Sequence, residues 1–190
     1  GEYLIRPLDF HSVPYGDEFR ADLRRVVERA AVLEDRAPDN DIARVARRLT
    51  MIHAEAVGAL GSGADVIGFH GQTILHEPAK RMTVQIGDAA LLAALTGCLV
   101  VSDFRSADMA AGGEGAPLAP VIHCVLGQKQ ERPLAVLNIG GVANVTWLGR
   151  NADAATGHQM LAFDTGPGNA MIDDWVRKVA GLDFDRDGAL

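Results

Sequence analysis

The stretch LAFDTGPGNAMIDDW, residues 161–175, decides how the second half of this sequence folds. Its apolar start predicts a short β-strand that ends at Asp164. A Gly-Pro-Gly corner follows, and the pattern from Asn169 to Ala180 predicts a helix with Gly181 as its C-cap. Asp164 therefore lies at the mouth of a strand-to-helix corner, and the local sequence leaves open whether it forms a turn or acts as a working carboxylate.

Two features of this corner favour a working carboxylate. In open α/β sheets, ligands collect at the carboxyl ends of strands, so Asp164 is expected to point into a crevice. The N-terminus of the following helix, which the side chain of Asn169 can cap, would place a positive dipole near that carboxylate. Asp173 and Asp174 lie in the first turn of the same helix and are interpreted as structural.

The rest of the sequence alternates between helical and strand-like patterns. Apolar residues at helical spacing predict helices over residues 17–35 and 41–60. Short apolar runs predict strands in residues 65–71 (DVIGFHG), 82–87 (MTVQIG) and 98–104 (CLVVSDF). Further helices are predicted in residues 88–97, with Gly97 as C-cap, and after the prolines of residues 116–127. This alternation predicts an α/β fold.

The run LAVLNIGGVANVTWLG, residues 134–149, predicts a β-hairpin with a primed turn at Gly140 and Gly141. Such a turn can point backbone N–H groups at phosphate oxygens, and a plain surface hairpin explains the pattern equally well. The sequence pattern changes just before this run, which predicts a domain boundary near Gln130.

The composition excludes several classes of function. With 190 residues, a net charge of −7 and a pI of about 5.3, the chain is a poor partner for nucleic acid or an anionic membrane. We find no signal peptide, and no apolar run approaches the ~18 residues that a membrane span needs. Cys98 and Cys124 form no CxxC pair, which favours free thiols in a cytoplasmic protein. His70 and His76 lack HExxH spacing, so no metal-ligating residues are predicted.

Polar or glycine-rich residues follow four of the predicted strands. They form the segments FHGQT (69–73), SDFRSAD with AGGEGAP (102–117), NIGG (138–141) and FDTGPGN (163–169). Because strand ends gather at one edge of an α/β sheet, this repetition indicates a ligand site. Gln72 and Thr73 suit the recognition of hydroxyl groups. An Asp–Arg pair such as Asp103 with Arg105 can hold a sugar or order the cleft, and the sequence leaves both open.

Five of these motifs together resemble the anhydro-N-acetylmuramic acid kinase family, of the sugar-kinase, actin and chaperone ATPase superfamily. They are FHGQTILHEP (69–78), TVQIGD (83–88), VVSDFRSADMAAGGEGAPLAP (100–120), LNIGGVANVT (137–146) and FDTGPGNAMIDDW (163–175). The resemblance implies a ribonuclease-H-like fold of two domains, incomplete at both termini. Residues 1–130 would form most of domain I, with the sugar side of the cleft, and residues 131–190 would begin domain II with the glycine hairpin and Asp164.

The resemblance also implies a reaction. The family uses ATP and Mg²⁺ to phosphorylate O6 of 1,6-anhydro-N-acetylmuramic acid while water opens the anhydro bridge, which gives N-acetylmuramic acid 6-phosphate in peptidoglycan recycling. By this resemblance Asp164 is the general base that deprotonates the water. The implied substrate-binding residues are His70, Gln72, Thr73, Asp103, Arg105, Asp108, Gly113 and Gly115. The implied ATP-phosphate-binding residues are Asn138, Gly140, Gly141, Asn144, Gly166, Gly168 and Asn169.

The sequence departs from the family pattern mainly at its ends. A Ser-Gly-Thr-Ser-type phosphate loop should precede residue 1, and an adenosine motif should follow Leu190, so we expect an internal fragment that is inactive alone. Glu114 stands where the family more often has Gln. The resemblance implies a cytoplasmic dimer. The alternatives are a kinase for another anhydrosugar such as levoglucosan, and a non-catalytic sugar- or nucleotide-binding module. The relative roles of Asp103 and Asp108 stay open.

Overall fold

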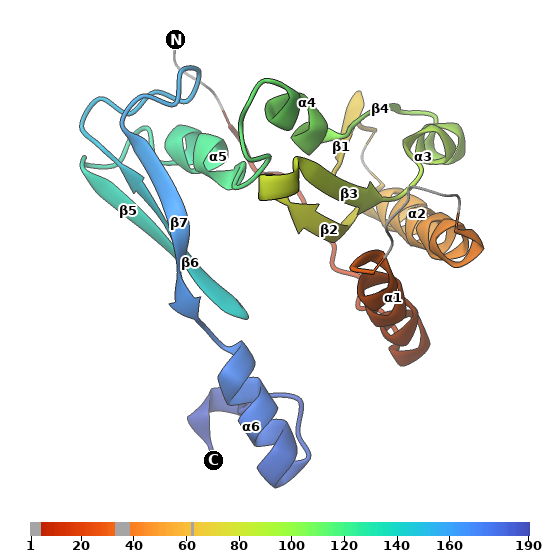
Figure 1. Cartoon of the computed structure of the whole chain (residues 1–190). Coiled ribbons are helices and arrows are strands. Elements are labelled where there is room, and N and C mark those ends of the chain that lie inside the picture. The colour runs from red at the N-terminus through yellow and green to blue at the C-terminus, as the bar shows by residue number, and fades with distance from the viewer. Residues whose placement is uncertain (1–4, 33–38, 62) are drawn as a thin grey trace. The chain divides into compact units, whose positions relative to one another are not determined.

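The computed structural model describes residues 5–32, 39–61 and 63–190, and it divides into two compact units (Figure 1). One unit contains residues 7–116, and the other contains residues 117–190 together with Ile5 and Arg6. Each unit mixes helices with strands, which confirms the predicted α/β class. No helix in the described ranges has both the length and the apolar composition to cross a bilayer.

The chain divides between residues 116 and 117, which is earlier than the boundary expected near Gln130. Helix α5 (Ala119–Leu126) accounts for the difference, because it packs against the sheet of the second unit. His123 on this helix hydrogen-bonds the hydroxyl of Thr146 in that sheet at 2.9 Å. The helix therefore packs with the strands that follow it in the chain. The change from a helical to a strand-like sequence pattern near Gln130 marks the end of a helix and does not reveal which unit that helix belongs to.

Helices α1 (Asp17–Ala30) and α2 (Asn40–Leu60) pack against each other in the first unit (Figure 1). Asp39 caps α2 by accepting hydrogen bonds from two backbone N–H groups of its first turn. The core of this unit joins apolar residues of both helices to two isoleucines of a hairpin: Phe19, Val26, Val45, Leu49, Ile74 and Ile86.

Helix α1 is shorter than the sequence predicted. It ends at Ala30 rather than near residue 35, because the chain tightens into a turn in which the N–H of Val32 bonds the carbonyl of Arg29 at 3.2 Å. The rest of the predicted helix, residues 33–35, lies outside the described residues.

The strands of the first unit are β1 (Val66–Phe69), β2 (Gln72–Glu77), β3 (Met82–Ile86) and β4 (Leu99–Ser102). β1 runs parallel to β4, and β2 pairs antiparallel with β3 around the short 3₁₀ turn η1 (Pro78–Lys80). The sequence prediction missed β2. Its pairing is irregular between Thr73 and Leu75, so the alternation of polar and apolar residues that marks a strand is interrupted.

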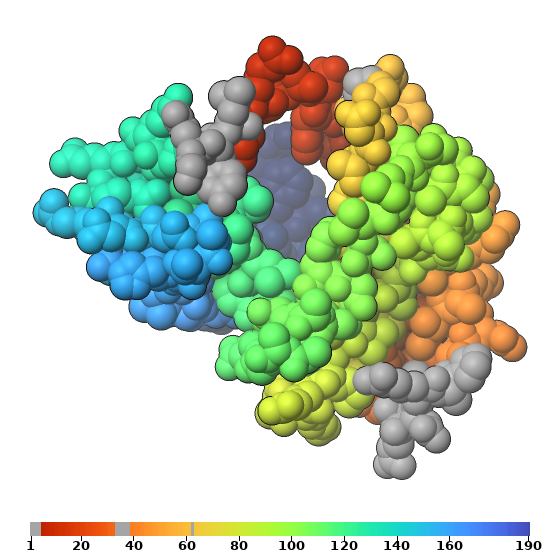
Figure 2. Space-filling view, turned by 90° about the horizontal axis from the view of Figure 1, so that it is seen from above, coloured from red at the N-terminus to blue at the C-terminus, as the bar shows by residue number. Residues whose placement is uncertain are grey.

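Two short helices complete the first unit. α3 (Ala89–Thr96) ends at Gly97 in the left-handed conformation, as predicted, and α4 (Phe104–Ala110) directly follows Asp103. In the space-filling view, the orange surface of α2 adjoins the yellow-green residues that follow it in the chain (Figure 2). Helix α2 also packs closely against α3.

The second unit is built on an antiparallel sheet in the order β5-β6-β7. Its elements are β5 (Leu134–Ile139), β6 (Val142–Leu148), β7 (Met160–Pro167), α6 (Ala170–Ala180) and the 3₁₀ turn η2 (Arg186–Gly188). The predicted hairpin of β5 and β6 is confirmed, and so is Gly181 as the left-handed C-cap of α6. The strand before the Gly-Pro-Gly corner runs further than expected, because Gly166 and Pro167 still pair with β6.

Two local predictions in this unit are wrong. Ile139 pairs with Ala143, which leaves residues 140–142 between them, and neither Gly140 nor Gly141 has a positive φ. A two-residue primed turn requires a positive φ, so this turn is of another kind. The side chain of Asn169 does not cap α6, because its amide donates to the carbonyl of Ile139 at 3.2 Å instead.

Candidate functional site

Asp164 lies within β7 and shares a rung of the sheet with two asparagines. The pairing sets Asn144 of β6 opposite both Asn138 of β5 and Asp164 of β7. Directly opposed residues project from the same face of a sheet, with Cβ atoms about 4.5–5.5 Å apart. Three residues from two separate motifs are thus adjacent, although Asp164 is exposed and does not end its strand.

The glycine turn and the Gly-Pro-Gly corner are bound to each other. The N–H of Gly168 donates to the carbonyl of Gly141 at 2.9 Å, and the N–H of Asn169 donates to the carbonyl of Gly140 at 2.7 Å. The hydroxyl of Thr165 adds a bond to the carbonyl of Ala143 at 3.1 Å. The predicted phosphate-binding residues therefore form one continuous structure beside the rung that holds Asp164.

Helix α5 packs on the same face of the sheet, next to the rung that contains Asn144. Thr146 lies two residues along β6 from Asn144, so the two side chains project to the same side. Thr146 is buried, and its hydroxyl forms a hydrogen bond with His123 of α5. The face is therefore packed at Thr146 and open at Asp164, which fixes the strand while leaving the carboxylate accessible.

In the first unit, the parallel pairing of β1 with β4 brings His70 next to Asp103. Phe69 pairs with Ser102, so the residues that follow them leave the two strands at the same edge. Asp103 adopts a φ of 58°, in the left-handed region that few residues other than glycine occupy. Such backbone strain clusters at functional sites, and here it directs the chain from β4 into α4.

Arg105 holds His70 in one orientation and one tautomer. Its Nε–H donates to Nε2 of His70 at 3.0 Å, so that nitrogen acts as the acceptor. Nδ1 then carries the proton and donates to the carbonyl of Gly71 at 3.0 Å. The assignment rests on the two partners together, and it fixes the imidazole ring at the edge where β1 and β4 end.

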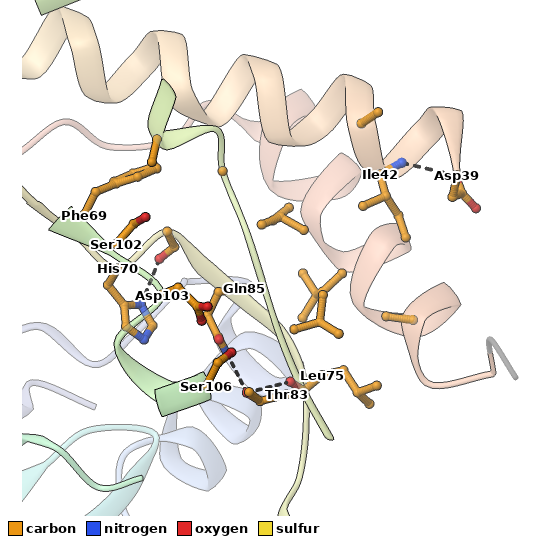
Figure 3. A pocket seen from close by; sticks show the side chains of 18 of the residues that line it. Asp39, Ile42, Phe69, His70, Leu75, Thr83, Gln85, Ser102, Asp103 and Ser106 are labelled. Atoms are coloured by element: carbon orange, nitrogen blue, oxygen red, sulfur yellow. Dashed lines mark hydrogen bonds between the residues drawn. The ribbon is translucent and has the colours of Figure 1, made fainter. Parts of the chain in front are cut away.

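A pocket of about 640 Å³ opens beside these strand ends (Figure 3). His70 and Asp103, which the resemblance implies as substrate-binding residues, line it. Polar residues that the sequence prediction missed also line it: Thr83, Gln85, Ser102 and Ser106. Ser106 lies on α4. Thr83 and Gln85 lie two residues apart in β3, so their side chains project from the same face, and this polar alternation along β3 was the signal in the sequence that could have identified them.

Other predicted substrate-binding residues support this region without lining the pocket. Asp108 accepts a hydrogen bond from the N–H of Gly115 at 2.7 Å, and its carbonyl accepts one from the N–H of Gly113 at 2.9 Å. The Asp108 side chain therefore shapes the glycine-rich loop. On β2, the amide of Gln72 donates to the carbonyl of Thr73 at 3.1 Å.

The residues around Asp164 fit a magnesium ion that is bound mainly by a nucleotide. Mg²⁺ takes oxygen ligands, keeps several waters and usually binds one or two carboxylates together with substrate phosphates. The Asp164 carboxylate and the amides of Asn138 and Asn144 provide oxygen donors on one rung. Within the described ranges, no group of three or more His, Cys, Asp or Glu side chains could hold a metal ion.

Two comparisons with known proteins, one with family models and one with curated sequences, point to the same family. The family model for anhydro-N-acetylmuramic acid kinase matches residues 3–190. Curated proteins of that name include one from Acidiphilium cryptum, 56% identical over 93% of this chain and 47% of the relative, and one from Zymomonas mobilis subsp. mobilis, 46% identical over 100% and 53%. Another, from Rhodospirillum rubrum, is 53% identical over 79% of this chain and 40% of its own length. The chain spans about half the length of the curated relatives it matches.

Proposed function

The chain belongs to the anhydro-N-acetylmuramic acid kinase family, and from this premise we propose that it forms part of an ATP-dependent kinase. The parent enzyme phosphorylates O6 of 1,6-anhydro-N-acetylmuramic acid as water opens the anhydro ring, giving N-acetylmuramic acid 6-phosphate for peptidoglycan recycling. One observation carries the proposal: Asp164 shares a rung with Asn138 and Asn144, beside a glycine turn bonded to the corner that follows Asp164.

Asp164 is the general base of the proposed reaction. It takes a proton from a water molecule as the oxygen of that water attacks C1 of the sugar. The C1–O6 bond breaks, O6 bonds to the γ-phosphorus of ATP, and ADP leaves. A positioned general base contributes typically ~10²–10⁴-fold to the rate. The exposed side chain of Asp164 supports this role, because water and substrate can reach it.

The glycine turn holds the ATP phosphates in this proposal. The carbonyls of Gly140 and Gly141 accept hydrogen bonds from the corner, which stiffens the turn. Among the described residues of this unit, no hydrogen bond uses the N–H of either glycine as a donor. Backbone N–H groups in a turn form an anion-binding concavity. Mg²⁺, when bound, neutralises charge on the transferring phosphoryl group.

The sugar lies at the edge where β1 and β4 end. The carboxylate of Asp103 can accept hydrogen bonds from hydroxyl groups, and the pair of Arg105 and His70 shapes the adjoining wall. The pocket of about 640 Å³ falls within the range typical of small-molecule sites. These features support a polar ligand of sugar size, and they leave Gln72, Thr73, Asp108, Gly113 and Gly115 as supporting residues.

The fold type and the division into domains are part of the same proposal. We assign a ribonuclease-H-like arrangement of two domains, with residues 7–116 in domain I and residues 117–190 in domain II. The antiparallel meander of β5, β6 and β7 followed by α6 supports a separate second domain, and the parallel pair of β1 and β4 supports an α/β first domain. A cytoplasmic location and a dimeric state rest on the family resemblance, and cell fractionation and light scattering test them.

The base assignment is tested by Asp164→Asn in the full-length enzyme. The amide keeps the size of the side chain and cannot take the proton, so turnover should fall about 10²–10⁴-fold. Binding of the anhydro amino sugar, measured by calorimetry, should stay near the wild-type value, because the base contributes to the chemical step.

Asp174→Asn is the matched control, because it removes an exposed carboxylate of α6 whose partner is Arg177. It should turn over at the wild-type rate. Near wild-type turnover by Asp164→Asn would show that another group is the base. Turnover of levoglucosan beside the amino sugar decides between the two anhydrosugar kinases, and absence of turnover with either would favour a binding module.

A further inference from the structure

Gln85 occupies the polar end of the pocket and has no role in the reaction proposed above. It lies in β3, and Figure 3 shows its side chain near those of Asp103 and Ser106, with Asp39 and Ile42 at the other end of the pocket. Side chains from β3 and from the start of α4 therefore meet at this end, next to the ring of His70.

Two threonines fix the orientation of the Gln85 amide. Its Nε2 donates to the hydroxyl of Thr83 at 2.7 Å and to the hydroxyl of Thr73 at 3.2 Å. The hydroxyl of Thr83 donates in turn to the carbonyl of Leu75 at 3.5 Å, which leaves its lone pairs for the amide. A carboxamide has two N–H donors and one carbonyl oxygen. Both donors are used here, so Oε1 is the group that Gln85 presents to a ligand.

Oε1 of Gln85 accepts no hydrogen bond from the described residues of the protein. Asp103, in the same pocket, is likewise an acceptor. A site lined by fixed acceptors discriminates strongly for ligands with donors in matching positions, because a ligand without them leaves the acceptors unpaired.

We propose that Oε1 of Gln85 accepts a hydrogen bond from the sugar and makes Gln85 a specificity-determining residue. This inference rests on the proposed function, which puts the anhydro amino sugar in this pocket. In 1,6-anhydro-N-acetylmuramic acid, the bridging O6 joins C1 to C6, so neither carbon carries a hydroxyl, and the lactyl ether blocks O3. The ring donors that remain are the N–H of the acetamido group and the hydroxyl at C4.

The first test is Gln85→Met in the full-length enzyme, which keeps the length of the side chain and removes the acceptor. Sugar binding, measured by calorimetry, should weaken about tenfold, as expected for one lost hydrogen bond. The KM for ATP should not change, since the sugar is the only one of the two substrates that Gln85 contacts in this proposal. Gln130→Met is the matched control, because this glutamine is exposed and lies outside the pocket, and it should bind sugar as the wild type does.

Substrate analogues identify the donor. If the C4 hydroxyl donates, the 4-deoxy sugar binds the wild type about tenfold more weakly, and Gln85→Met adds no further loss. If the acetamido N–H donates, the same pattern holds for the 2-deoxy sugar that lacks the acetamido group. The inference would be overturned if, for both analogues, the loss of affinity from the analogue multiplied with the loss from Gln85→Met. Wild-type sugar affinity in Gln85→Met would also overturn it.

Thr83 gives a second route if Gln85→Met fails to fold. Thr83→Val removes the hydroxyl that orients the amide, whereas Thr83→Ser keeps it, so the valine variant should bind sugar more weakly than the serine variant. Equal affinities would contradict the inference. Failure of the proposed function can be distinguished from failure of this inference. In that case the wild-type enzyme itself would neither bind nor phosphorylate the anhydro amino sugar.

Discussion

At the scale of single residues, space rather than backbone freedom requires glycine at position 168. Its φ lies outside the left-handed region, so a side chain would meet no conformational barrier there. A Cβ atom at this position would lie 2.1 Å from the carbonyl oxygen of Gly140 and 3.3 Å from the backbone nitrogen of Ala143. The corner can therefore approach the turn closely enough to hydrogen-bond it only when residue 168 has no side chain.

We expect Gly168→Ala to separate the corner from the turn. The backbone must shift to relieve the contact, which should destabilise the protein by about 1–3 kcal/mol and lower kcat for the kinase reaction. Thermal unfolding and steady-state turnover measure the two effects. In α2, Gly58 faces open space, so Gly58→Ala should instead stabilise the helix by roughly 0.5–1 kcal/mol. Equal effects of the two substitutions would refute the packing argument.

At the scale of elements, a buried carboxylate joins α1 to α2. Asp22 on α1 accepts a hydrogen bond from Nη1 of Arg44 on α2 at 2.8 Å, and it also pairs with Arg25 and Arg48. The hydrogen bond from Arg44 is the main reason why the pKa of Asp22 lies below its ordinary value of 3.8. The two helices are thus tied by charge at the edge of the core that contains Phe19.

This pairing predicts how stability changes in acid. Because the pKa of Asp22 is lowered by folding, its contribution is fully present above about pH 4 and is lost as the pH falls through the folded-state value. Asp22→Asn should lower the midpoint of thermal unfolding at pH 7, and the difference from the wild type should shrink below pH 4.

Asp17→Asn is the matched control, since it removes an exposed carboxylate of the same helix that pairs with Arg20. Exposed pairs contribute little, so its midpoint should stay near that of the wild type at every pH. A gap between Asp22→Asn and the wild type that stays constant from pH 7 to pH 3 would mean that Asp22 acts through packing rather than charge.

At the scale of the whole molecule, the residues assigned to the proposed reaction fall in both units. Asp164 and the glycine turn belong to residues 117–190, whereas His70, Asp103 and the pocket belong to residues 7–116. On the sheet face opposite Asp164, Leu137 and Phe163 form a rung with Val145 and are 58% and 50% exposed. Large apolar residues exposed together usually mark a surface that another segment covers.

We expect residues 1–190 alone to bind ATP more weakly than the full-length protein and to show no kinase turnover. The chain spans about half the length of its curated relatives, so the rest of such a protein can complete the nucleotide site. Calorimetry with ATP on both proteins measures the difference. Equal affinity, or turnover by the shorter chain, would show that these residues suffice.

The sequence by itself determined the features that depend on neighbouring residues. Apolar spacing predicted α2, the β5–β6 hairpin and α6, and the glycines after α3 and α6 were predicted as C-caps because left-handed backbone favours glycine. The motifs also pointed to Asp164 and to His70, since polar residues after apolar strands are visible without a structure.

Only the tertiary structure decided which of these residues meet. Strand register set Asn138, Asn144 and Asp164 on one rung, and parallel pairing set His70 beside Asp103. Cross-strand contacts join residues far apart in the chain, so spacing along the sequence cannot specify them. For the same reason the sequence missed Gln85, whose role depends on hydroxyl groups from β2 and β3, and placed Asn169 as a helix cap although its amide bonds the carbonyl of Ile139.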